Sequence, residues 1–275
     1  YHAWTYGLDG ALTHVPLAQA FPGLPQADRG LSEVACSERH GLVWVTLDPD
    51  TPHDVDTFLG PLGDELAALG LDQHVVYRRT ARRCAANWKF LADAFLENYH
   101  VRRLHRQSVG GFFVDSVSVF DSVGPHMRTA TARKSLLDPP PEAPPSSLMT
   151  MSYHIAPWTM LIVHPGFISR LSLLPRAVDE MDFVHEMLIP RADDTPERAE
   201  HWRRSFELID GGVFQGEDIM IAERSQVGLS AGANDALLFG ALEAPAVAFH
   251  AALRRMLASP DAALDAAHFE ALATR

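Results

Sequence analysis

Three short apolar segments in the middle of the chain constrain its fold more than any other feature. Residues 159–164, 168–174 and 182–189 have the composition of strands, and Pro165-Gly166 and residues 177–180 separate them. Runs of this length between turn residues are typical of neighbouring antiparallel strands. The sequence therefore predicts an antiparallel meander.

The segments around this meander predict further elements and no internal repeat. Further strands are expected at 1–6, 41–47, 75–83 and within 110–120, and helices at 54–69, 86–99, 195–209, 217–229 and 244–257. The run Asp48-Pro49-Asp50-Thr51-Pro52 marks a module boundary. We expect an α+β protein, in which a small β module at 1–52 precedes a domain at 53–275 with helices collected on an antiparallel sheet.

Composition excludes some classes of partner. The net charge of −12 argues against nucleic acid as a partner, and no apolar run is long enough to span a bilayer. Cys36 and Cys84 cannot form a disulfide framework, which favours a reducing, cytoplasmic location. The chain begins at Tyr1 without Met, so we expect the front of the protein to be missing.

The segment Glu97 to His105 is the first candidate site. It closes an amphipathic run, 86–99, in which Glu97 and His100 would share one helical face. His105 would point about 140° away from His100 in a regular helix, since each residue turns the helix by about 100°. Both imidazoles can reach one point only if the helix ends or distorts near Val101. The alternative is a polar helix end with two solvated histidines.

A metal held by these histidines needs a further ligand. Asp218, at the start of a predicted helix, is the best carboxylate candidate, and the adjacent Glu217 is the alternative. Two histidines and one carboxylate form the facial triad of non-haem Fe(II) oxygenases, which leaves positions open for O₂. Without a metal, Asp218 would be an ordinary acid at a helix start, stabilised by the helix dipole.

Four segments together resemble a known family. Three of them are Asn87-Trp88-Lys89, Glu97-x-x-His100-x-x-x-x-His105 and Glu217-Asp218-x-x-x-x-Glu223-x-x-Gln226. These resemble the catalytic α subunit of Rieske-type aromatic-ring-hydroxylating oxygenases. The fourth, Tyr1-His2-Ala3-Trp4 followed by Leu8-Asp9-Gly10, resembles the second half of that family's Rieske motif.

The resemblance implies a role for each matching residue. His100, His105 and Asp218 match the ligands of the mononuclear Fe(II), and Glu97 matches the acid that bridges the two metal centres. His2 matches one histidine ligand of a [2Fe–2S] Rieske cluster, whose other ligands would lie before Tyr1. The implied fold is a remnant of an all-β Rieske domain followed by a helix-grip (START/Bet v 1-like) catalytic domain. Many members have Glu-Asn-Tyr or Glu-Asn-Phe where this chain has Asp93-Ala94-Phe95, so the family's amide near the iron would be absent.

The implied function is that of an oxygenase component. It would use O₂ and two electrons, delivered through a ferredoxin or flavin reductase, to hydroxylate or oxidatively demethylate an aromatic or other apolar small molecule, and it would assemble as a homotrimer. Candidate substrate-binding residues include Phe95, Phe112, Met160 and Phe214, with His164 as a further pocket residue. The proline-rich insert at 138–147 would be a loosely packed lid near the pocket mouth. Two alternatives stay open: a metal-free helix-grip module that binds an apolar ligand, and a zinc hydrolase.

Overall fold

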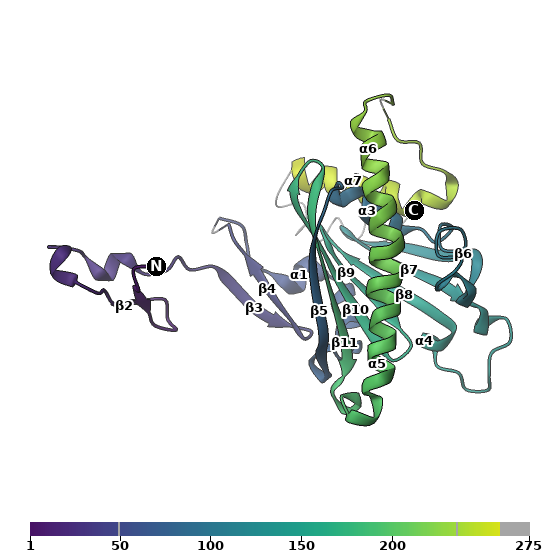
Figure 1. The fold of residues 1–275 in the computed structure, drawn as a ribbon, viewed down its shortest axis with the longest axis horizontal. Helices are drawn as coiled ribbons and strands as arrows, with labels where there is room; N and C mark the ends of the chain where they lie inside the picture. The colour runs from purple at the N-terminus through teal and green to yellow at the C-terminus, as the bar shows by residue number, and fades with distance from the viewer. Residues whose placement is uncertain (49, 235, 259–275) are drawn as a thin grey trace. The chain divides into compact units, whose positions relative to one another are not determined.

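The computed structural model describes residues 1–48, 50–234 and 236–258 (Figure 1). These residues form two compact units. The first contains residues 1–39 and 43–55, and the second contains residues 40–42 and the chain from Asp56 onward. The two units separate near Val55.

The N-terminal unit contains two small hairpins. Strand β1 (Thr5–Tyr6) pairs with β2 (Leu12–His14), and β3 (Ala35–Arg39) forms a second two-stranded sheet with β4 (Leu42–Thr46). Gly10 has a φ of +79° in the turn of the first hairpin, a conformation that glycine adopts without steric cost. His2 lies before β1 and is exposed.

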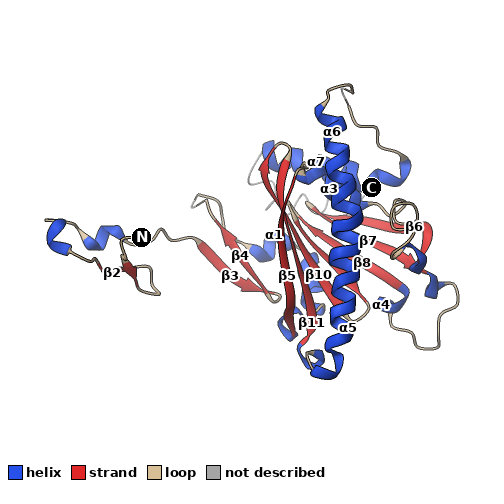
Figure 2. Cartoon of the chain, viewed as in Figure 1, coloured by secondary structure: helices blue, strands red, loops and turns tan. Residues whose placement is uncertain are grey.

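The second unit is built on a seven-stranded antiparallel sheet (Figure 2). The spatial order is β5-β11-β10-β9-β8-β7-β6. The strands are β5 (His74–Cys84), β6 (Phe113–Val123), β7 (His126–Arg133), β8 (Met149–Ile155), β9 (Thr159–His164), β10 (Phe167–Ala177) and β11 (Glu180–Pro190). The predicted meander is β9-β10-β11. Strands β7 and β8 were not expected from the sequence, and they extend the meander on its other side.

The helices lie between and after the strands. They are α1 (Val55–Leu59), α2 (Leu62–Ala68), α3 (Trp88–Leu96), α4 (Pro145–Leu148), α5 (Ala199–Phe206), α6 (Met220–Ser230) and α7 (Ala244–Ala258). Figure 1 shows α5 and α6 as parts of one long helix that crosses the sheet. This is the arrangement expected of a helix-grip domain.

The expected gap between helices 195–209 and 217–229 is wrong. A π-helical segment, η8 (Glu207–Ile219), joins α5 to α6 without a break. The three glycines in this segment lowered the expected helix propensity, but packing against the sheet overrides propensity. A side chain at Gly216 would come within 3.1 Å of the Gly211 carbonyl oxygen, so glycine suits the distorted helix here.

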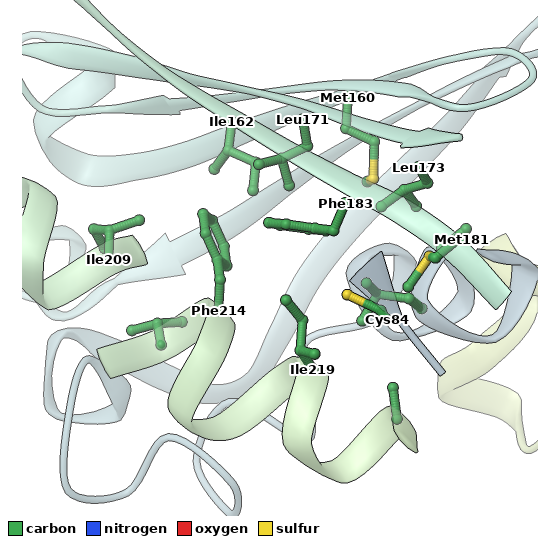
Figure 3. Packing of buried hydrophobic residues seen from close by; sticks show 14 of the residues in the cluster. Cys84, Met160, Ile162, Leu171, Leu173, Met181, Phe183, Ile209, Phe214 and Ile219 are labelled. Carbon is green, nitrogen blue, oxygen red and sulfur yellow. The ribbon is translucent and has the colours of Figure 1, made fainter. Parts of the chain in front are cut away.

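The core lies between this helix and the sheet. Figure 3 shows Ile209, Phe214 and Ile219 directed from the helix toward side chains of the strands. Phe183 on β11 is fully buried beside Phe214, with ring centroids 5.7 Å apart. Burying each such side chain contributes about 1.5–3 kcal/mol, so this face fixes the helix on the sheet.

The proline-rich insert lies between β7 and β8. Residues 138–142 are exposed, and α4 begins at Pro145, which agrees with a loosely packed segment. No described residue between 134 and 149 lines the cavity described below, although Arg133 and Thr150 on either side do. The structure therefore does not support a lid role for the insert.

Candidate metal centre

The segment that carries both histidines is irregular. Helix α3 begins after Asn87, whose side-chain oxygen accepts a hydrogen bond from the Lys89 N–H at 2.9 Å, and it ends at Leu96. Glu97 is extended, with φ −123° and ψ 162°. The expected helix therefore ends three residues before Tyr99. Glu97 and His100 still meet, through a turn instead of a shared helical face.

Three side chains converge on one point across more than a hundred residues. One ligand atom each from His100, His105 and Asp218 lies within 4.8 Å of the others. The Nε2 of His105 lies 3.1 Å from Oδ1 of Asp218, and the Nε2 of His100 lies 4.0 Å from the same oxygen. A set of two imidazole nitrogens and a carboxylate suits a first-row divalent metal.

The carboxylate of Asp218 fits a metal better than it fits the protein around it. Asp218 is only 2% exposed, and neither carboxylate oxygen has a hydrogen-bond partner in the part of the chain that the structure describes. The short contact to His105 lacks hydrogen-bond geometry, although the atoms are close. A buried carboxylate without donors is costly unless a cation compensates it, so these residues fit a bound metal.

Two further carboxylates, Glu97 and Glu217, hold the two imidazoles. Nδ1 of His100 donates to Glu97 at 2.5 Å, and Nδ1 of His105 donates to Glu217 at 2.7 Å. The Ser108 hydroxyl also donates to Glu217, at 2.6 Å. Each Nδ1–H is thereby engaged, which leaves each Nε2 lone pair facing Asp218. Glu217 thus contacts the far side of His105, and the structure does not place it as a ligand in the position of Asp218.

The acids around His105 also shift the pKa of its imidazole. Burial of the ring opposes protonation, but the carboxylates of Asp218 and Glu217 outweigh burial and raise the pKa of His105 above its ordinary value. The site therefore concentrates negative charge where the imidazoles converge. Such a site attracts cations.

A cavity of about 400 Å³ opens beside the metal centre. One wall, from the helices and the loop after α3, is mostly apolar and includes Phe95, Leu96, Val101, Val109, Phe112, Val213 and Phe214. The other wall comes from the sheet and carries polar groups: Ser118, Thr129, Thr131, Arg133, Thr150, Ser152 and His164. The pocket is therefore two-sided, whereas the sequence indicated apolar walls with His164 as a further residue, and His164 does line the cavity.

The structure places three of the four candidate pocket residues on the cavity. Phe95, Phe112 and Phe214 line it, but Met160 does not. Met160 shares a strand face with Ile162, yet it lies deeper along β9 and is fully buried in the core. Figure 3 shows it in the same core layer as Phe183 and Leu173, which fill the space at that level.

Several cavity residues were missed from the sequence. Asn98 lines the cavity, and no described residue hydrogen-bonds its buried amide nitrogen, so an amide is present although Asp93-Ala94-Phe95 lacks the family's asparagine. Thr129, Thr131 and Arg133 alternate along β7, and this period of two was the signal for a strand with one face toward the cavity. Small and polar residues on that strand made its pattern weak.

Comparison with known proteins now identifies the group of proteins to which this one is related. The family of ring-hydroxylating alpha subunits (catalytic domain) matches residues 71–259, which include all three converging side chains and the whole cavity. The chain belongs to this family. The match covers more than half of the chain and leaves out the N-terminal unit.

Individual members cover smaller parts of the chain. The chain is 31% identical over 121 residues to the carnitine monooxygenase oxygenase subunit of Escherichia coli K12, which is 43% of this chain and 31% of that protein. It is 30% identical over 112 residues to the anthranilate 1,2-dioxygenase large subunit of Acinetobacter baylyi, 38% of this chain and 24% of that protein. The matched segment is therefore less than a third of either relative.

Solved structures share the fold. A quaternary ammonium Rieske monooxygenase in complex with L-carnitine superposes with a TM-score of 0.73 at 18% identity, over 92% of this chain and 70% of that chain. At this identity the likeness concerns the fold, an α+β catalytic domain with a large antiparallel sheet.

No helix in the described part of the chain is both long and apolar enough to cross a membrane.

Proposed function

We propose that this chain is the catalytic part of a Rieske non-haem iron oxygenase that oxidises a small organic molecule with O₂. One observation carries the proposal: His100, His105 and Asp218 converge, and no described residue donates a hydrogen bond to the buried Asp218 carboxylate. Family membership supports an oxygenase over a zinc hydrolase or a metal-free binding module.

Each residue of the centre has a distinct role in the proposal. His100, His105 and Asp218 would hold Fe²⁺, which supplies the redox chemistry that activates O₂. Glu97 and Glu217 accept the Nδ1–H of their histidines and so fix the ring orientations. The apolar wall beside Phe95 and Phe214 excludes water from the substrate and orients it by contact.

Electron supply would come from outside the described catalytic unit. His2, with ligands before Tyr1, would hold part of a [2Fe–2S] cluster, reduced by a ferredoxin or flavin reductase. In a homotrimer the cluster of one protomer would reach the iron of the next through Glu97. The two free cysteines, Cys36 and Cys84, suit a reducing cytoplasm.

Relatives indicate the range of reactions. The names of two relatives specify carnitine for a monooxygenase and anthranilate for a dioxygenase. We propose that this chain acts on a small molecule of comparable size, because its cavity of about 400 Å³ is near the lower end of typical ligand pockets.

The test begins with iron. The chain is purified and reconstituted with Fe²⁺ under anaerobic conditions, and we expect about one iron per chain, lost in Asp218→Ala and His105→Ala. The full-length protein with a reductant and ¹⁸O₂ should then place labelled oxygen in the product. A wild-type chain that binds its ligand equally well without iron, and retains none, would favour the metal-free binding module.

A further inference from the structure

The sheet wall of the cavity contains a cation, Arg133, that forms no ion pair with any described residue. Arg133, the last residue of β7, lines the cavity and is half-buried. Its guanidinium donates one hydrogen bond to the Thr150 hydroxyl at 3.1 Å and lies over the rings of Phe112 and Phe113, at 5.8 and 5.2 Å. Among the described residues no carboxylate forms an ion pair with it.

Comparable arginines of the same sheet are paired. Arg128 on β7 pairs with Asp121 and Glu65, Arg170 on β10 pairs with Glu186, and Arg82 on β5 pairs with Asp210. Burial lowers the pKa of Arg133 below its usual value. Charged groups are rarely buried without a partner, so the exception on a cavity wall indicates a missing anion.

A second orphan group lies on the same wall. The Nε2 of His164 is buried and has no hydrogen-bond partner. Burial and the nearby charges of His185 and Arg133 lower the pKa of His164 to about 3, so this imidazole is neutral and can donate one N–H. Its ring stacks on Phe167, with centroids 4.4 Å apart, which fixes its orientation. Arg133 and His164 therefore give one cavity wall two polar groups whose hydrogen-bonding capacity the described residues leave unused.

We propose that Arg133 and His164 bind the carboxylate of the substrate, so that the substrate is a small organic acid. The guanidinium has five N–H donors in a planar fork, and the bond to Thr150 uses only one of them. The remaining donors can hold a carboxylate in bidentate geometry. The carbon skeleton of the acid then extends along the apolar wall toward the metal centre. That the bound acid is the substrate rests on the proposed oxygenase function. Binding of the acid to Arg133 and His164 does not depend on that function.

The test compares acids with neutral or cationic partners of the same skeleton. Binding to the full chain is measured by calorimetry for anthranilate against aniline, and for glycine betaine against choline. We expect at least one acid to bind more tightly than its partner. Arg133→Met should weaken binding of that acid by about 10–100-fold, as expected for loss of a charge-assisted hydrogen bond. The affinity for its neutral or cationic partner should not change. Arg128→Met, which removes an arginine of the same strand outside the cavity, should preserve the preference.

A second measurement needs no variant. Phenylglyoxal modification, read by peptide mass spectrometry, should label Arg133 in the free protein, and the bound acid should protect it while aniline or choline does not. A preference that survives Arg133→Met, tighter binding of aniline or choline than of the acids, no binding of either acid, or equal labelling with and without acid would each overturn the proposal. Since these measurements use neither O₂ nor electrons, their failure is distinct from failure of the iron and ¹⁸O₂ experiment.

Discussion

Replacing Glu217 by Gln tests how the site fixes its metal ligands. Glu217 accepts hydrogen bonds from Nδ1 of His105 and from the Ser108 hydroxyl, at 2.7 and 2.6 Å. The substitution keeps the length of the side chain and one acceptor oxygen but removes the negative charge. The variant therefore isolates the electrostatic part of holding His105 in the orientation that turns Nε2 toward Asp218.

The size of the effect follows from these contacts. A hydrogen bond to a charged group contributes about 1.5–3 kcal/mol, and one between neutral groups about 0.5–1.5 kcal/mol. The difference of about 1–1.5 kcal/mol corresponds to roughly tenfold in metal affinity, at the lower end of the range for groups behind a ligand. Ser108→Ala should cost less, because the Ser108 hydroxyl contacts the Glu217 carboxylate and the His105 main-chain carbonyl but not the imidazole.

The assay is an anaerobic Co²⁺ titration against a chromophoric chelator at fixed pH, with Co²⁺ standing for ferrous ion. Glu223→Gln is the matched control, since Glu223 lies on the same helix and accepts a hydrogen bond from the Ala85 N–H at 3.0 Å. The control should stay within about twofold of wild type. Unchanged affinity in Glu217→Gln would refute the positioning role, and complete loss of binding would instead make Glu217 a direct ligand.

Three further outcomes are expected. Full-length Glu97→Gln should retain iron and a reducible cluster but reoxidise that cluster slowly in stopped-flow mixing with substrate and O₂; wild-type reoxidation would exclude Glu97 as the bridge. Burial and the neighbouring His126 hold the pKa of His154 at about 4, below its usual 6.5, so the unfolded chain binds a proton that the folded chain does not, and stability should fall by up to about 3 kcal/mol as pH drops from 6.5 to 4. Urea unfolding at several pH values should show that the stability of His154→Phe depends less on pH than that of the wild type. Met160→Ala should cost about 2–5 kcal/mol of stability because Met160 is core, whereas Phe112→Ala, at a half-exposed cavity residue, should mainly change ligand affinity.

The sequence predicted the meander because its strands are apolar and sharply bounded. Strand β9 begins and ends at the predicted residues, Thr159 and His164. Strand β7 was missed because the residues that alternate along it are mostly Thr and Ala, and neither residue is a strong sign of a buried strand face. The same strand carries Arg133, so the sequence indicated a mainly apolar pocket with His164 and missed the polar residues of β7.

The candidate metal site could be predicted from spacing and resemblance, but the reasons for its geometry could not. The expectation that the helix must end near Val101 was correct in kind, since α3 ends at Leu96. The carboxylate behind His105 comes from Glu217, 112 residues away, and only the fold brings the two together. Sequence spacing gives local contacts, such as Glu97 with His100, and leaves distant ones undetermined.

The long helix presents two buried aspartates eight residues apart, and their surroundings differ. Asp210 accepts hydrogen bonds from Thr80, Arg82 and His185 on the sheet, and although burial opposes its ionisation, these donors hold its pKa at about 2. Asp218 has none. The paired aspartate fixes the position of the helix on the sheet, because a slip of one residue along the π-helical segment would turn the Asp210 side chain away from all three donors. The same slip would turn Asp218 away from His100 and His105. The hydrogen bonds of Asp210 therefore help to orient Asp218 toward His100 and His105. No described residue donates a hydrogen bond to Asp218, so its carboxylate is available to a metal.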